Sequence, residues 1–552
     1  MRTCFAVALL LAKTVVAQGV WETRASYPIE ATEVSAVEID GQVYALCGLT
    51  LTGSSSALFI YNPRTDSWRP GAPLPVAGGA DHCNVAAVGG RLYLLGALGA
   101  LAGSADTYEY DPRTDRWQVV GRMPNPRGAS GAAAIGSKIF VAGGLAGGRS
   151  VATFEAFDAA TRQWTPLPNM LTARDHLTAQ ALNGRFYAIS GREGEVLEAN
   201  EEYDPETNTW RRRAPILTPR GGLGSGVLGG RIQVFGGEGP SGTPQGTYRH
   251  NEEYDPATDR WRSLAPMPTP RHGIYGATLP GAVFVPGGGP RAGLFVSNVH
   301  EAFFLPPAEA PAIERGGVRN AASHAETVSP GTLVSLFGRN LAPREQAASR
   351  FPLPLQMSAT AVRVNGTPAP LLYVSPSQIN FLLPHELAAG TLTVTVWHAG
   401  VESQGLALPA PAASTPGLFS LSQTGEGQGA ILIAGTSLVA GQILEVASRP
   451  ARKGEIVEIY ATGLGRVAGA APPLGQPAPA SPLVATARLA RVTMGGAAAE
   501  VLFSGLAPGL AGVYQVNARV PAGAAAGPRA VVTLRMAEDE PISNTVTMAV
   551  VE

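Results

Sequence analysis

The chain has 552 residues, with 41 Lys and Arg against 42 Asp and Glu, and a formal net charge of −1. This length predicts several domains, and the balanced charge without a basic stripe argues against a nucleic-acid-binding surface. Glycine and proline are abundant, at 67 and 46 residues, which is typical of a chain built from short strands and turns.

The first residues, 1–17, have the features of a signal peptide. A basic start precedes an apolar stretch, and Val15-x-Ala17 fits a small-residue cleavage site before Gln18, although Lys13 interrupts the apolar stretch. Elsewhere no run of uncharged apolar residues is long enough to cross a bilayer, so we expect no membrane span. The sequence therefore predicts a secreted or cell-surface protein that is cleaved near Ala17.

Six tryptophans recur at intervals of 46 to 51 residues, and a period of this length is typical of stacked supersecondary units. They are Trp21, Trp68, Trp117, Trp164, Trp210 and Trp261. The last five end one repeated phrase, exemplified by YNPRTDSW (61–68) and YDPATDRW (254–261). In this phrase an aromatic residue ends one strand, an Asp or Asn starts a turn by bonding nearby backbone N–H groups, and the tryptophan opens the next strand.

A second phrase precedes the first in each repeat. It is a short apolar strand that runs into glycine, as in VYALCG (43–48) and IFVAGG (139–144). A two-residue turn such as Gly89-Gly90 precedes this strand, as in a β-hairpin. Each repeat is therefore expected to form a four-stranded antiparallel meander.

This pattern resembles the kelch repeat, whose units form the blades of β-propellers. The resemblance covers about residues 19–305. Trp21 precedes the first glycine-ended strand, and the last unit (274–305) has no tryptophan of its own. We therefore expect an all-β fold with a six-bladed propeller over 18–305, in which the N-terminal strand completes the sixth blade and leaves no free sheet edge.

The tryptophan period stops at a Pro/Ala-rich stretch, predicted as a linker over 306–315. A weaker duplication follows, in which 329–342 resembles 451–465. Alternating apolar strands with frequent turn signals indicate two β-sandwiches, over 316–412 and 413–552.

Motifs in this region, among them NAAS (320–323) and YVSPSQINF (373–381), resemble the acidobacterial, Solibacter-type C-terminal domain. The resemblance implies immunoglobulin-like sandwiches that act as spacer or display modules.

Cys47 and Cys83 are expected on neighbouring blades. A disulfide between them would suit an exported protein, and two buried thiols are the alternative.

Candidate site residues gather where the first strands of the blades are expected to begin, because these strands line the channel of a propeller and their starts form one mouth. They are His82, Arg127, Arg174, His176, Arg220, Arg271 and His272. The arginines would suit an anion or a sugar acid, since guanidinium groups bind carboxylates in a bidentate manner. The competing interpretation is structural: each arginine pairs with an acid of its own or the next blade, such as Glu155, Glu202 or Glu253.

The histidines fall in blades 2, 4 and 6, and three imidazoles are ligands that a metal ion could use. We expect opposing first strands to be too far apart for one ion to contact all three, so the sequence predicts no metal site and no cofactor. Asp175 and Glu193 are expected to be solvated loop residues.

The favoured function is that of an exported, monomeric, non-enzymatic binding or adhesion protein. Its propeller mouth would bind an extracellular glycan or protein, and its sandwiches would act as spacers. The alternative is an exported carbohydrate-active enzyme that uses the Arg/His mouth, by resemblance in architecture to kelch-type sialic-acid mutarotases or to copper radical oxidases such as galactose oxidase. The oxidase needs seven blades and a Tyr–Cys crosslink, and the chain has no nucleophile-elbow or phosphate-loop motif. A purely structural surface protein is the third interpretation.

Overall fold

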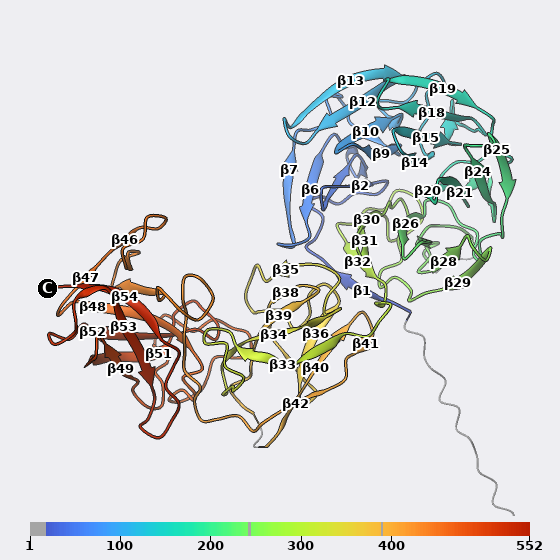
Figure 1. Cartoon of the computed structure of the whole chain (residues 1–552). Helices are drawn as coiled ribbons and strands as arrows, with labels where there is room; N and C mark the ends of the chain where they lie inside the picture. Colours follow the sequence, from blue (N-terminus) through green and yellow to red (C-terminus); the bar gives the residue numbers. More distant parts are fainter. Residues whose placement is uncertain (1–17, 241–243, 388–389) are drawn as a thin grey trace, which may run out of the picture.

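The computed structural model describes residues 18–240, 244–387 and 390–552, and every regular element in these ranges is a β-strand. None of the described residues forms a helix that could cross a membrane. The chain builds a ring of six antiparallel sheets followed by two sandwiches (Figure 1).

The six sheets of the ring are the blades of a β-propeller, and each has four strands. Blade 1 contains β2 (Ser35–Ile39), β3 (Gln42–Leu46), β6 (Leu58–Asn62) and β7 (Ser67–Gly71). Blade 2 contains β9 (Val85–Val88), β10 (Arg91–Leu95), β12 (Asp106–Asp111) and β13 (Arg116–Arg122). Blade 3 contains β14 (Gly131–Ile135), β15 (Lys138–Ala142), β18 (Phe154–Asp158) and β19 (Gln163–Leu167). Blade 4 contains β20 (Thr178–Leu182), β21 (Arg185–Ile189), β24 (Asn200–Asp204) and β25 (Thr209–Arg212). Blade 5 contains β26 (Gly224–Leu228), β27 (Arg231–Phe235), β28 (Asn251–Asp255) and β29 (Arg260–Ser263). Blade 6 contains β30 (Ala277–Leu279), β31 (Ala282–Pro286), β32 (His300–Phe304) and β1 (Val20–Thr23).

The N-terminal strand closes the ring, as predicted. β1 pairs antiparallel with β32, with Trp21 opposite Phe303. The Trp21 indole N–H donates a hydrogen bond of 2.8 Å to the carbonyl of Ala265, which follows blade 5. Trp68, Trp117, Trp210 and Trp261 make the corresponding bond to a backbone carbonyl in the segment that follows the preceding blade. The periodic tryptophans therefore tie each outer strand to its neighbouring blade.

The repeated turn phrase also forms as predicted. The side chain of Asn62 accepts the N–H of Arg64, and Asp111 accepts that of Arg113 in the same way. The aromatic residue adds a second bond, because the Tyr61 hydroxyl donates to Asp66, which lies at φ 50° in the turn. These polar contacts all form within the turn itself, which explains why the same residue types recur at this position in each repeat.

A disulfide joins Cys47, directly after β3, to Cys83, two residues before β9, and so links blades 1 and 2. Both residues are fully buried in an apolar cluster shared by these two blades. Of the two alternatives that the sequence left open, the structure has the disulfide.

The first sandwich has two five-stranded sheets. One contains β33 (Ala312–Asn320), β34 (Leu333–Arg339), β39 (Gln378–Leu382), β38 (Leu371–Val374) and β35 (Gln346–Ala347). The other contains β37 (Thr367–Ala369), β36 (Thr360–Val364), β40 (Leu392–His398), β41 (Val401–Glu402) and β42 (Leu406–Leu408). β33 begins inside the stretch expected as linker, because Ala312 and Ile313 already pair with the end of β34.

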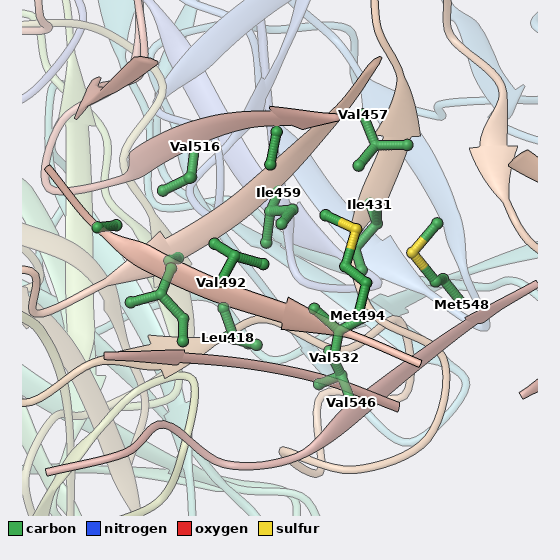
Figure 2. Close-up of a cluster of buried hydrophobic side chains, with 14 of the residues drawn as sticks. Leu418, Ile431, Val457, Ile459, Val492, Met494, Val516, Val532, Val546 and Met548 are labelled. Carbon is green, nitrogen blue, oxygen red and sulfur yellow. The ribbon is translucent and has the colours of Figure 1, made fainter. Parts of the chain in front are cut away.

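The second sandwich encloses a larger apolar core (Figure 2). One sheet contains β46 (Ser448–Arg449), β45 (Val439–Ala440), β44 (Ile431–Ile433), β48 (Ile456–Thr462), β52 (Tyr514–Arg519), β51 (Glu500–Leu506) and β43 (Gly417–Leu418). The other contains β47 (Ala451–Arg452), β54 (Val546–Val551), β53 (Gly527–Arg535), β49 (Arg491–Met494) and β50 (Ala497–Ala498). Ile459 and Val516 from the first sheet face Met494 and Val532 from the second, so the inward side chains of both sheets fill one core.

The first sandwich docks on the propeller at the closing blade (Figure 1). The carboxylate of Glu22, on β1, accepts hydrogen bonds from the backbone N–H of Ala359 and the side-chain amide of Gln356. The Arg344 guanidinium lies over the ring of Phe284, 4.4 Å from its centroid. The strand that closes the propeller is therefore also a docking surface for the sandwich.

Candidate functional site

The first strands of the blades line a channel cavity of about 260 Å³ along the propeller axis. Its wall consists largely of small residues, with Tyr275 as its one large aromatic among the described lining residues. At one end, a residue two to four positions before each first strand takes a left-handed backbone conformation. These residues are Glu33, His82, Ala129, His176, Gly222 and Gly273, with φ between 49° and 61°. We call these six positions the mouth ring.

Backbone hydrogen bonds link the mouth ring from blade to blade. The N–H of Ala129 donates to the carbonyl of His82, that of His176 to Ala129, and that of Gly222 to His176, each at 2.9 Å. Three ring positions have small residues and three have Glu33, His82 and His176. A left-handed conformation disfavours side chains larger than glycine, so these three are held there by the surrounding structure at some cost in strain.

The four predicted arginines do not face the channel. Arg127, Arg174, Arg220 and Arg271 are at most 1% exposed. Each forms an ion pair within its own blade, with Glu155 at 2.5 Å, Glu201 at 3.0 Å, Glu252 at 2.7 Å and Glu301 at 2.8 Å, respectively. Each also donates to backbone carbonyls of the glycine-ended strand, as Arg220 does to Gly236 and Val234. Burial lowers the pKa of these guanidinium groups, and the paired glutamates oppose this shift.

The structural interpretation of the arginines therefore holds, with a correction to their partners. The paired glutamate lies two residues before the aromatic of the turn phrase, as Glu155 does. Glu202 and Glu253 lie one residue later and point to the other side of the strand, because successive strand residues alternate in direction. They bind Arg211 and Arg262, which are more than half exposed.

His82 and His176 come together across the mouth. Their ring centroids lie 4.9 Å apart. The carboxylate of Glu33 joins them, and one ligand atom from each of the three residues lies within 4.8 Å of the others. The expectation was that one ion could not contact all three histidines. The group that lies close together contains two of them, His82 and His176, with Glu33 as its third member in place of His272.

Two identical relays orient these imidazoles. His82 Nδ1 lies 2.6 Å from a carboxylate oxygen of Asp81, whose other oxygen accepts the hydroxyl of Ser54. In blade 4, His176, Asp175 and Ser150 repeat the arrangement. Because a carboxylate only accepts hydrogen bonds, Nδ1 carries the proton and the lone pair is on Nε2.

The relay also corrects the expectation for Asp175. This residue is only 5% exposed and bonded to His176, and it is not a solvated loop residue. Glu193, in contrast, is exposed.

His272 lies at the same mouth, one position before the ring. It is 2% exposed, and neither of its ring nitrogens has a hydrogen-bond partner. Its Nδ1 is 3.8 Å from an oxygen of Glu33 and 3.5 Å from one of Glu238. Arg192 completes the cluster: it donates to Glu238 at 2.6 Å and to His176 Nε2 at 3.1 Å.

The charges at the mouth act on one another. Burial alone would raise the pKa of the Glu33 carboxyl, but the three histidines and Arg192 hold it below its usual value. Burial alone would lower the pKa of His82, but Glu33 and Asp81 raise it above its usual value. The four carboxylates of Glu33, Asp81, Asp175 and Glu238 outnumber the single guanidinium of Arg192, so the cluster favours positive charge.

Sequence reasoning found His82, His176 and His272 but missed Glu33, Arg192 and Glu238. The Asp-His dipeptides at 81–82 and 175–176 were a usable signal, because they occur at the same register of blades 2 and 4. Arg192, in β22 (Arg192–Glu193), and Glu238 belong to the connections between the second and third strands of blades 4 and 5, and their approach to the mouth depends on how the blades are arranged.

Comparison with known proteins identifies the modules. The Kelch motif family model matches residues 31–75, 126–171 and 219–268, and the IPT/TIG domain model matches 323–411. Similar curated proteins include Kelch-like protein terF of Aspergillus terreus, 32% identical over 124 residues, which are 22% of this chain and 27% of terF. Kelch-like ECH-associated protein 1A of Danio rerio is 31% identical over 108 residues, 18% of this chain and 17% of that protein.

The chain thus spans about a quarter or less of the length of these relatives. Among solved structures, one titled "Structure of YjhT" aligns with a TM-score of 0.43 and 16% identity, covering 50% of this chain and 95% of that one. Kelch motifs and an IPT/TIG domain are therefore present in this all-β chain, which combines a kelch propeller with immunoglobulin-like sandwiches.

Proposed function

We propose that this is an exported binding protein whose propeller holds a protein partner on the mouth face. The observation that carries this proposal is an apolar rim beside the polar mouth. Leu51, at the tip of the hairpin between β4 (Leu49–Thr50) and β5 (Gly53–Ser54), is 77% exposed, and Leu294 is 73% exposed. Phe295 is 46% exposed beside Leu294.

These apolar side chains come from neighbouring blades. Leu51 belongs to the connection between the second and third strands of blade 1, and Leu294 and Phe295 to that of blade 6. Both connections reach the mouth: Leu49 pairs with Thr32, and Ser297 pairs with Ala31, directly before Glu33. Exposed apolar groups rimmed by polar residues are typical of protein-binding surfaces.

Binding of a glycan at the mouth has less support than binding of a protein. It relied on four arginines as ligands for an acidic sugar, and these are enclosed within the blades. The same point weakens the enzyme alternative, since Arg174 has no path to a substrate in the channel.

We also propose that the chain is exported, with cleavage after Ala17, and that it is a monomer. Its domains would be the propeller over 18–305 and the sandwiches over 316–412 and 413–552. Cleavage there keeps the closing strand, since the Gln18 carbonyl accepts the N–H of Ala265 and β1 starts at Val20. The Cys47–Cys83 disulfide suits an oxidising compartment. We further propose that 316–551 is a Solibacter-type C-terminal region, whose sandwiches hold the propeller away from the cell.

The test uses the full chain, crosslinked on the surface of cells that produce it. We expect a partner that the double variant Leu51→Asp/Leu294→Asp no longer captures. The matched control is Leu444→Asp, a fully exposed leucine on the second sandwich, which should capture it normally. Equal capture by all three proteins, or loss in the control as well, would contradict a partner site at the mouth.

A further inference from the structure

We propose that the mouth ring holds a divalent transition-metal ion of the Zn²⁺ type, bound by Glu33, His82 and His176. This site does not depend on the proposed protein partner. Two imidazole nitrogens and a carboxylate oxygen are ligands that such ions prefer. Their ligand atoms already lie within 4.8 Å of one another. Bonds of about 2.1 Å in a tetrahedron place ligand atoms about 3.4 Å apart, so the site needs only small side-chain shifts.

The two histidines have acids behind them, as the histidine ligands of metal ions do. Asp81 and Asp175 accept the Nδ1 protons of His82 and His176, which directs both Nε2 lone pairs away from the acids. His82 Nε2 faces Glu33, at 3.6 Å from its carboxylate. Histidine ligands of metal ions almost always have such a carboxylate or carbonyl behind them. Here Ser54 and Ser150 fix the carboxylates in turn.

His272 is an independent observation that points to a cation at this cluster. A buried imidazole without any hydrogen bond is costly, yet both of its nitrogens lack one. Its Nδ1 faces Glu33 and Glu238, at the edge of the same cluster. A bound cation would share the Glu33 carboxylate with it, or take its Nδ1 as a fourth ligand.

The backbone supports the same conclusion. The mouth ring is left-handed at all six positions, and glycine or alanine occupies three of them. Glu33, His82 and His176 are the three that keep a ligating side chain in this conformation, and these three converge. The fold therefore tolerates a small residue at these positions, which provides conservative variants for a test.

Replacing Arg192 should strengthen metal binding, whereas replacing a ligand should weaken it. The Arg192 guanidinium donates to His176 Nε2, the lone pair that the metal would use, and adds positive charge at the site. Removing it should therefore tighten metal binding. In a merely structural polar network, its loss would bring no gain in metal affinity.

The experiment titrates the EDTA-treated full chain with ZnCl₂ by calorimetry and with Co²⁺ by visible absorption. We expect one ion per chain and a tetrahedral Co²⁺ spectrum. His82→Ala or His176→Ala, which install the residue that blade 3 has at Ala129, should weaken binding more than about 100-fold with the fold intact by circular dichroism. Asp81→Asn should weaken it about 10-fold to 100-fold, and Arg192→Gln should strengthen it several-fold.

The control is His324→Ala, which alters a histidine of the first sandwich whose Nε2 lies 3.0 Å from the Gln423 carbonyl; this variant should bind the ion normally. Absence of Zn²⁺ and Co²⁺ binding by the unaltered chain would overturn the proposal. So would retention of the ion by the folded His82→Ala/His176→Ala double variant, or weaker binding by Arg192→Gln.

Discussion

The guanidinium of Arg220 and the carboxylate of Glu252 form an ion pair of 2.7 Å inside blade 5, and both side chains are at most 1% exposed. The same pairing recurs in blades 3, 4 and 6. Arginines that sequence patterning placed in a ligand pocket are thus internal braces, each of which joins the first loop of a blade to its third strand.

Replacing Arg220 with Met should destabilise the propeller by about 3–5 kcal/mol, because the Glu252 carboxylate would remain buried without a positively charged partner. The measurement is the free energy of unfolding in urea. The double variant Arg220→Met/Glu252→Leu should recover much of this loss, since the unpaired charge is then gone. Arg211→Met is the control: that guanidinium is 63% exposed, and its loss should cost less than about 1 kcal/mol. Unchanged stability in Arg220→Met would contradict the bracing role.

Trp21→Ala should weaken the closure of the ring. The indole packs on Phe303, with centroids 5.1 Å apart, and its N–H bonds to Ala265. We expect a loss of roughly 3 kcal/mol, measured by thermal unfolding. Trp21→Phe keeps the packing and should cost only about 1 kcal/mol, for the hydrogen bond. Closure by β1 would be in doubt if both variants unfolded at the temperature of the unaltered chain.

Reduction of the Cys47–Cys83 disulfide should lower the free energy of unfolding by roughly 4 kcal/mol, because the bond closes a loop across 36 residues. The comparison is thermal unfolding with and without a thiol reductant. The Cys47→Ser/Cys83→Ser variant serves as the control and should not respond to reductant. An equal response in both proteins would show that the effect does not come from this bond.

Stability should fall in acid through His300. Burial lowers the pKa of this imidazole to about 3, and its Nδ1–H donates to the Ala25 carbonyl. In the unfolded chain its pKa is about 6.5, so the unfolded state takes up a proton first as the pH falls. The free energy of unfolding is therefore unaffected by His300 above about pH 6.5 and falls progressively between there and about pH 3. At pH 5 the loss is about 2 kcal/mol.

The matched variant for this prediction is His300→Phe, which keeps an aromatic ring against Tyr61. In the unaltered chain the ring centroids of His300 and Tyr61 lie 4.5 Å apart. Its unfolding free energy should fall less between pH 7 and pH 5 than that of the unaltered chain, by about 2 kcal/mol. Identical pH dependence would show that other groups dominate the acid response.

The sequence by itself determined the blades. Turn chemistry and strand alternation are local, so the eight residues that end at Trp68 are enough to predict a hairpin. The position of Trp21 ahead of the first repeat predicts closure by the N-terminus. The duplication after residue 315 likewise predicts two sandwiches, because an alternating pattern needs a second sheet to cover it.

Only the tertiary structure decided the site. Arg174 and His176 are two residues apart, yet one is enclosed in its blade and the other joins the cluster with Glu33 and His82. Glu33, His82 and His176 come from blades 1, 2 and 4, and their ligand atoms lie within 4.8 Å of one another. A periodicity within one repeat cannot predict how residues of different repeats meet. Which side chains share a site in a propeller is set by closure of the ring, and that is a property of the whole chain.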